Sequence, residues 1–302
     1  GQRKSLFIGC NYTGQENELR GCINDCHNMA EFICDHFGFS NDNMLMLTDD
    51  QEDPDYQPTA ENIIGALHWL VHDSAPGDSL FFHFSGHGVS VEDEDGDEAD
   101  GFDEAICPVD YVEHGVIVDD MLHDTLVRPL QPGVRLTAVF DCCHSGTALD
   151  LPYVYMCDGE IQRCRKSYRR HAAKAFAEVA RGLKELNTVY AARQLKEGIK
   201  LLRKQGDNKE AQRKTEETRT SMADVIMFSG CRDDQTSADI QEHEVEPTGA
   251  LSHALIATLR DDPNQSYTRL LKNLRLKMKG QFTQIPQLST GHAMDMSMTF
   301  VM

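Results

Sequence analysis

Short apolar runs, each bounded by polar or turn-forming residues, alternate along the chain with segments whose apolar residues fall three and four positions apart. The runs are typical of buried strands, and the spaced pattern is typical of amphipathic helices. Strands are predicted at residues 4–9, 44–47, 80–84, 136–140, 224–229 and 296–301. Helices are predicted at residues 22–37, 59–72, 119–127, 249–259 and 266–278. The alternation predicts an α/β fold, with a mostly parallel sheet and helices on both faces.

Two of the predicted strands end in chemically reactive residues. One runs directly into SGHG (residues 85–88) and another into DCCHSG (residues 141–146). Because the carboxyl ends of parallel strands share one edge of a sheet, we expect His87 and Cys143 to meet there. An imidazole holds a neighbouring thiol near its thiolate form and later protonates the leaving amine of a peptide. The pair therefore predicts a cysteine peptidase; the alternative is a structural histidine beside two small buried hydrophobes, Cys142 and Cys143.

The two motifs resemble those of the metacaspases, caspase-like cysteine peptidases, and specifically the type I pattern. Further segments similar to this family follow in the family's order: GCINDC (21–26), DGFDEAICPVDY (100–111), IVDD (117–120), LDLPY (149–153), MFSGCRDDQTSAD (227–239) and TGALSHALI (248–256). The resemblance leaves out roughly residues 157–221. It implies a caspase-like sandwich in which Cys143, rather than Cys142, is the nucleophile and His87 moves the protons. The backbone N–H groups of Gly88 and Cys143 would then hold the oxyanion.

An acidic residue beside the nucleophile suggests the substrate. Asp141 precedes Cys143 by two positions, and strand alternation places both side chains on one side of the strand end. A carboxylate there attracts a cationic side chain and is a poor neighbour for a thiolate unless the substrate brings a cation. The resemblance adds Cys22, Asp25 and Ser85 to a pocket for Arg or Lys before the scissile bond. The alternative for Asp25 is a favourable charge at a helix N-terminus.

Acidic residues also suggest a metal. Nine of them crowd residues 91–104, but the Gly and Glu positions do not match an EF-hand loop, so a solvated loop is predicted there. The resemblance implies instead a Ca²⁺ site made of Asp103, Asp119, Asp120 and Asp150. Hard oxygen ligands favour Ca²⁺ over zinc. Because Asp150 is near Cys143 in the sequence, Ca²⁺ bound to Asp150 would order the catalytic loop. The alternative is that Asp119 and Asp120 simply begin a helix.

Charge divides the chain into three parts. Residues 160–220 hold 17 Lys and Arg against 8 Asp and Glu, although the whole chain carries a net charge of −20. We predict a large-subunit-like catalytic region at 1–157, a basic helical insertion and linker at 158–221, and a small-subunit-like region at 222–302 that completes the same sheet. An enzyme that prefers Arg or Lys would cut its own basic segment, for example near Lys166, Arg170 or Lys174.

Amino-acid composition limits the expected classes of binding partner and the expected cellular compartment. The acidic remainder argues against nucleic-acid binding and suits basic peptide or protein substrates. Ten irregularly spaced cysteines, with no visible signal peptide or long apolar segment, predict a reduced cytoplasmic or nuclear protein away from membranes. We expect a monomer, a missing N-terminal extension and a role in programmed cell death. The rival functions are a catalytically silent Ca²⁺-binding scaffold on the same fold and, more distantly, a Cys/His zinc module.

Overall fold

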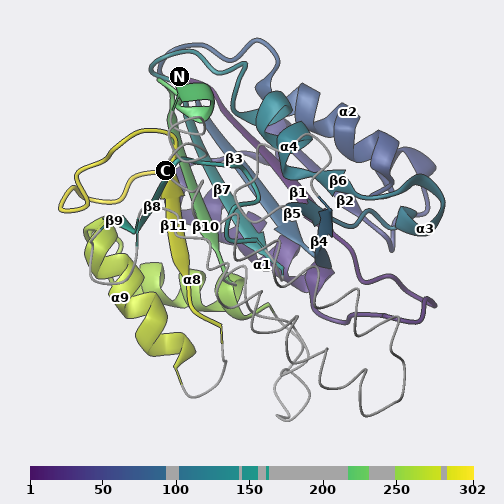
Figure 1. The fold of residues 1–302 in the computed structure, drawn as a ribbon. Helices are drawn as coiled ribbons and strands as arrows, with labels where there is room; N and C mark the ends of the chain where they lie inside the picture. The colour runs from purple at the N-terminus through teal and green to yellow at the C-terminus, as the bar shows by residue number, and fades with distance from the viewer. Residues whose placement is uncertain (93–101, 143–144, 156–160, 163–216, 231–248, 280–283) are drawn as a thin grey trace, which may run out of the picture.

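The computed structural model describes residues 1–92, 102–142, 145–155, 161–162, 217–230, 249–279 and 284–302. Eight strands form its main sheet: β1 (Arg3–Gly9), β2 (Met44–Thr48), β3 (Ser79–Ser85), β7 (Arg135–Asp141), β8 (Tyr153–Tyr155), β9 (Ile161–Gln162), β10 (Asp224–Ser229) and β11 (Gln287–Thr290). Their order is β2-β1-β3-β7-β10-β11-β8-β9 (Figure 1). The first five in this order are parallel, and the remaining three pair antiparallel. The predicted mostly parallel sheet is therefore confirmed.

Helices cover both faces of this sheet (Figure 1). They are α1 (Cys22–Phe37), α2 (Ala60–Val71), α4 (Asp119–Leu126), α8 (Ala250–Asp261) and α9 (Tyr267–Met278). Helices α2 and α4 share one apolar core with Phe82 and Phe84 of β3, whereas α1, α8 and α9 share the other with Phe81. This division follows from strand alternation, which sends successive side chains of β3 to opposite faces. His83 therefore lies on the same side as α1 and α8.

Side-chain caps explain where two of the predicted helices begin. The hydroxyl of Thr59 accepts a hydrogen bond from the N–H of Asn62 at the start of α2. The hydroxyl of Ser266 likewise accepts from the N–H of Arg269 at the start of α9. Each cap satisfies a backbone donor that the helix leaves without an internal partner.

A second, smaller sheet stands beside the main one. It consists of β4 (Gly88–Glu92), β5 (Phe102–Ile106) and β6 (Ile117–Val118). Short helical turns occupy α3 (Tyr111–His114), η1 (Asn41–Asn43) and η2 (Pro54–Tyr56). The loop predicted across residues 91–104 is therefore wrong at both ends, because β4 and β5 pair there; its middle, 93–101, lies outside the described residues.

The strand predicted at residues 296–301 is also wrong. The last strand is β11, and only an isolated bridge joins Ser266 to Thr299. The apolar residues of this segment, Met296 and Phe300, pack into the core shared by α1, α8 and α9 instead of into the sheet. The basic insertion predicted at 158–221 falls almost entirely outside the described residues.

Candidate active site

The edge of the sheet where β3 and β7 end brings the two sequence motifs together. The register between these strands pairs Ser85 with Asp141, so SGHG and DCCHSG leave the sheet at the same level. Cys143 itself lies outside the described residues, and its approach to His87 remains a prediction. Its neighbour Cys142 is buried in the apolar core under α2 and α4. Such burial suits a packing role for Cys142 better than a nucleophilic one.

Main-chain groups hold the imidazole of His87. Its Nε2 lies 2.7 Å from the backbone carbonyl oxygen of Asn17. Because a carbonyl oxygen only accepts hydrogen bonds, this nitrogen carries a hydrogen, and a neutral ring then keeps its lone pair on Nδ1. No sequence pattern points to Asn17, because any residue offers the same backbone carbonyl, so only the fold identifies this partner of His87.

A buried tyrosine supports the histidine from behind. The hydroxyl of Tyr12 accepts from the N–H of His87 at 2.9 Å and donates to the carbonyl oxygen of Cys107 at 2.7 Å. The two rings lie 4.7 Å apart between centroids. A Cβ at Gly86 would stand 2.9 Å from the Tyr12 hydroxyl, so glycine is needed for this close approach. The sequence patterns do not single out Tyr12 as part of the site.

Two carboxylates, those of Asp25 and Asp141, meet beside this edge. The hydroxyl of Ser85 donates to Asp25 at 2.9 Å, and the thiol of Cys22 hydrogen-bonds the same hydroxyl. The N–H of Gly249 lies 2.8 Å from both oxygens of Asp25, and the N–H of Ser252 donates to Asp141 at 2.7 Å. A Cβ at Gly249 would fall 2.2 Å from Asp141 and 2.6 Å from Asp25, so both acids close around one glycine.

The shared burial of the two acids changes their protonation. Burial, together with the neighbouring Asp141, raises the pKa of Asp25 to about 8. Burial raises the pKa of Asp141 as well. The Cys22 thiol, with a pKa raised by burial to about 12, keeps its hydrogen at neutral pH. A cation placed between the carboxylates would relieve this repulsion and favour the ionised form of both.

Comparison with known proteins identifies the family. A family model described as the metacaspase peptidase C14 domain matches residues 3–152. The chain is 48% identical to Metacaspase-1 of Emericella nidulans over 306 residues, covering all of this chain and 73% of that protein. It is 49% identical to Metacaspase-1B of Aspergillus clavatus, covering all of this chain and 72% of the relative. The chain belongs to the metacaspase family of cysteine peptidases.

A solved structure supports the fold assignment. Protein GSU0716 from Geobacter sulfurreducens superposes with a TM-score of 0.58 at 22% identity, covering 98% of this metacaspase and 95% of the other chain. The architecture is thus the caspase-like sandwich expected from the sequence. Among the helices that the structure describes, none is both long enough and apolar enough to cross a membrane.

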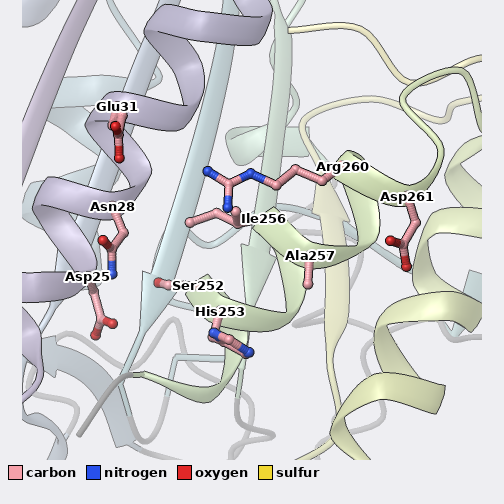
Figure 2. Close-up of a pocket in the computed structure, with 9 residues that line it drawn as sticks. All are labelled: Asp25, Asn28, Glu31, Ser252, His253, Ile256, Ala257, Arg260 and Asp261. Carbon is pink, nitrogen blue, oxygen red and sulfur yellow. The ribbon is translucent and has the colours of Figure 1, made fainter. Parts of the chain in front are cut away.

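A polar groove leads from the carboxylate pair along the helical face of this metacaspase. It has a volume of about 400 Å³ and separates α1 from α8 (Figure 2). Its lining residues are Asp25, Asn28, Glu31, Ser252, His253, Ile256, Ala257, Arg260 and Asp261. Figure 2 shows the Asp25 carboxylate and the Ser252 hydroxyl on facing walls at one end. Among its charged residues, Asp261 is paired with Lys277 at 2.7 Å, and the pKa of Asp25 is raised. Glu31 and Arg260 therefore nearly balance, and the groove is polar rather than strongly charged.

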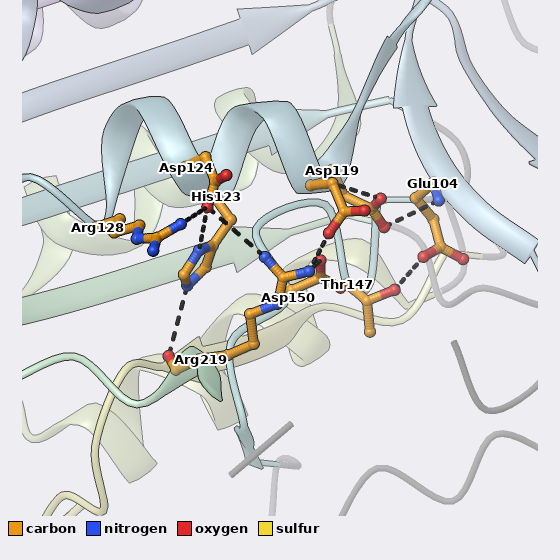
Figure 3. A network of polar contacts seen from close by, with 9 residues as sticks. Glu104, Asp119, His123, Asp124, Arg128, Thr147, Asp150 and Arg219 are labelled. Atoms are coloured by element: carbon orange, nitrogen blue, oxygen red, sulfur yellow. Dashed lines mark hydrogen bonds and ion pairs between the residues drawn. The ribbon is translucent and has the colours of Figure 1, made fainter. Parts of the chain in front are cut away.

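Three of the residues predicted to bind Ca²⁺ lie on α4 and in the loop after β7, and Figure 3 labels Asp119 and Asp150 among them. Asp120 forms an ion pair with Arg219, whose guanidinium also lies 3.7 Å from Asp150 and 4.0 Å from Asp124. The structure therefore joins two of the predicted ligands through one internal cation. Asp150 adopts a positive φ of 44°, a conformation that Asp tolerates better than most residues.

The other two predicted ligands are engaged differently. Asp119 accepts hydrogen bonds from the backbone N–H groups of Glu104 and Asp120, at 2.9 and 3.0 Å. Asp103 is buried on β5, next to Glu104, whose carboxylate accepts from the hydroxyl of Thr147. Within the described ranges, no three or more His, Cys, Asp or Glu side chains are grouped closely enough to hold a metal ion. A metal site here requires Arg219 to leave.

Proposed function

We propose that this metacaspase is a Ca²⁺-activated cysteine endopeptidase that cleaves peptide bonds after Arg or Lys. The observation that carries the proposal is the pair of buried carboxylates, Asp25 and Asp141, at the edge of the sheet from which both motifs depart. Among the described residues, neither acid forms an ion pair with Lys, Arg or His, and burying an unpaired carboxylate is costly. An incoming guanidinium or ammonium would offset that cost.

The proposed reaction assigns a role to each group expected at this edge. The Cys143 thiolate attacks the carbonyl carbon, and the backbone N–H groups of Gly88 and Cys143 stabilise the oxyanion. With Nε2 of His87 donating to Asn17, Nδ1 is the nitrogen that takes the thiol proton and passes it to the leaving amine. A water molecule, deprotonated by the same nitrogen, then hydrolyses the acyl-enzyme and regenerates the thiol.

The proposed metal site is supported by its donor chemistry. Carboxylates from β5, α4 and the loop after β7 are the hard oxygen ligands that Ca²⁺ prefers. Asp120 and Asp150 already face one shared cation, the Arg219 guanidinium, so this place favours positive charge. Asp103, Asp119, Asp120 and Asp150 would hold Ca²⁺ once Arg219 withdraws. Bound Ca²⁺ would supply charge neutralisation and fix the loop that runs from Cys143 to Asp150.

A fluorogenic Arg-peptide assay with and without Ca²⁺ tests this proposal. We expect cleavage with Ca²⁺ and its loss in excess EGTA, because the metal would order the catalytic loop. Isothermal titration should show that Asp120→Asn weakens Ca²⁺ binding, whereas Arg219→Gln strengthens it by roughly tenfold, since a partly buried competing cation is gone. Undiminished activity in EGTA would exclude Ca²⁺ dependence. Ca²⁺ binding without any cleavage would favour the silent scaffold instead.

Self-processing in the basic segment is a further expected result. Residues 160–220 carry an excess of nine positive charges, which complements the acidic pocket. Incubation with Ca²⁺ should produce two fragments, and mass spectrometry should find new ends after Lys166, Arg170 or Lys174. Cys143→Ala protein, treated identically, should stay intact and serves as the control. Recovery of only full-length active protein would rule out self-cleavage.

A further inference from the structure

A buried histidine that the proposed mechanism does not use lies directly behind the carboxylate pair. His83, on β3, is fully buried and lies between α1 and α8. Its Nδ1 is 3.5 Å from the thiol sulfur of Cys26, and its Nε2 is 2.8 Å from the hydroxyl of Ser252. Ser252 in turn hydrogen-bonds Asp141 through both its backbone N–H and its side chain. Four side chains, each from a different element, thus form one continuous path that ends at Asp141.

Only one arrangement of hydrogens satisfies this path when Asp141 is ionised. Burial lowers the pKa of His83 to about 3, so its ring is neutral and has a single N–H. An ionised carboxylate only accepts, so the Ser252 hydroxyl gives its one hydrogen to Asp141 and must accept from Nε2–H of His83. Nδ1 then accepts from Cys26, whose burial raises the thiol pKa well above its usual value. Every donor in the path points toward Asp141.

The alternative direction penalises the ionised acid. If His83 carried its hydrogen on Nδ1, Nε2 would accept from Ser252, and Asp141 would lose a hydroxyl donor. The carboxylate would then depend on the backbone N–H groups of Leu251 and Ser252 alone. Burial already pushes Asp141 toward its protonated, neutral form, so one donor fewer matters there.

We propose that His83 is a positioning residue for substrate recognition, which orients the Ser252 hydroxyl so that Asp141 stays ionised and able to bind a cationic side chain. This inference rests on the proposed preference for Arg or Lys. Several groups face Asp141 from the surrounding elements: Asp25 and Cys22 of α1, Ser85 of β3, and Ser252 of α8. His83 acts on Asp141 only through Ser252.

Two substitutions and two peptides test this role. His83→Phe keeps the ring volume but removes the donor, and Ser252→Ala removes the hydroxyl. Each should raise KM for an Arg peptide by roughly tenfold, the value of one hydrogen bond to a charged group, with kcat little changed. KM for the matching citrulline peptide, which has the shape of Arg without its charge, should not move. His83→Gln, which restores an N–H donor at the position of Nε2, should recover most of the affinity for the Arg peptide.

Combining the variants separates positioning from general damage. Because His83 acts through Ser252, the double variant should be no worse than Ser252→Ala alone. Thr137→Val removes another buried hydroxyl from the strand that carries Asp141 and should leave both peptides unaffected. Additive losses, or equal losses for the Arg and citrulline peptides, would overturn the proposal. If the wild-type enzyme does not distinguish the two peptides, the proposed specificity fails, and this inference fails with it.

Discussion

Cys143→Ala is expected to abolish peptide cleavage, with kcat lowered by roughly four orders of magnitude or more, because no other group can form the acyl-enzyme. His87→Ala should cost nearly as much, since nucleophile and base act as one unit. The measurement is the turnover of an Arg peptide in the presence of Ca²⁺. A binding titration with a peptide or an inhibitor should show that both variants still bind substrate. Both variants should retain the melting temperature of the parent enzyme, and His87 lies outside the apolar core that the structure describes.

The adjacent cysteine provides the matched control. Cys142 is buried within the core under α2 and α4, so Cys142→Ala should lower stability modestly but leave much of the turnover. An active Cys143→Ala enzyme together with an inactive Cys142→Ala enzyme would transfer the nucleophile to Cys142. That outcome would also require the end of β7 to be remodelled, because Cys142 now points away from the pocket side.

Asp25→Asn is expected to lower kcat/KM for Arg peptides by roughly 100-fold, because one partner of a buried charge pair is lost. The amide oxygen still accepts from Gly249, so the fold should survive. The variant should be more stable than the parent at pH values above about 4. In the parent, the pKa of Asp25 is raised to about 8 in the folded state, so folding opposes ionisation of this acid, and the free energy of unfolding falls as the pH rises from about 4 to about 8. The asparagine of the variant does not ionise and avoids this loss. A variant that unfolds would instead melt lower at every pH.

The same acid predicts a pH signature. Below about pH 8 the substrate-free enzyme holds a proton on Asp25, and a cationic substrate must displace it. The groups that surround this carboxylate are Asp141, Cys22, Ser85 and the N–H of Gly249. The ratio of kcat/KM for an Arg peptide to that for its citrulline twin should therefore rise from pH 6 to 8. The ratio cancels the titration of the catalytic groups. A flat ratio, or faster cleavage of an Asp-ended peptide, would refute the acidic pocket.

Sequence patterns predicted the parallel half of the fold well and the antiparallel half poorly. Four of the parallel strands are apolar on both faces: β1, β3, β7 and β10. Their amino-acid sequences alone therefore indicate buried strands. The strand β11 reads Gln-Leu-Ser-Thr and is nevertheless fully buried. Its pairing with β10 and β8 is a long-range property that no local pattern contains. Met296 and Phe300 misled the prediction because a segment without strand structure carries them into the core, where Phe300 packs against Phe37, Tyr267 and Phe228.

The candidate site divides in the same way. Asp25, Ser85 and Asp141 were predicted from motifs, and the structure brings them together. The backbone carbonyl of Asn17 leaves no signal in the sequence, because every residue has one. Arg219 lies at the end of the basic segment, far along the chain from the acids that it contacts. Main-chain groups and distant ion pairs are therefore the contributions that only a folded chain discloses.

The start of α8 reaches both pocket acids with main-chain donors, at Gly249 and Ser252. A side-chain scan cannot delete such donors, so mutagenesis alone would undervalue this helix. A displacement of α8 by about one ångström would, in contrast, weaken the hydrogen bonds to both acids together, because hydrogen bonds are short-ranged. The affinity for basic residues thus depends on the position of the whole helix α8. Any change that shifts this helix alters the hydrogen bonding of both acids at once.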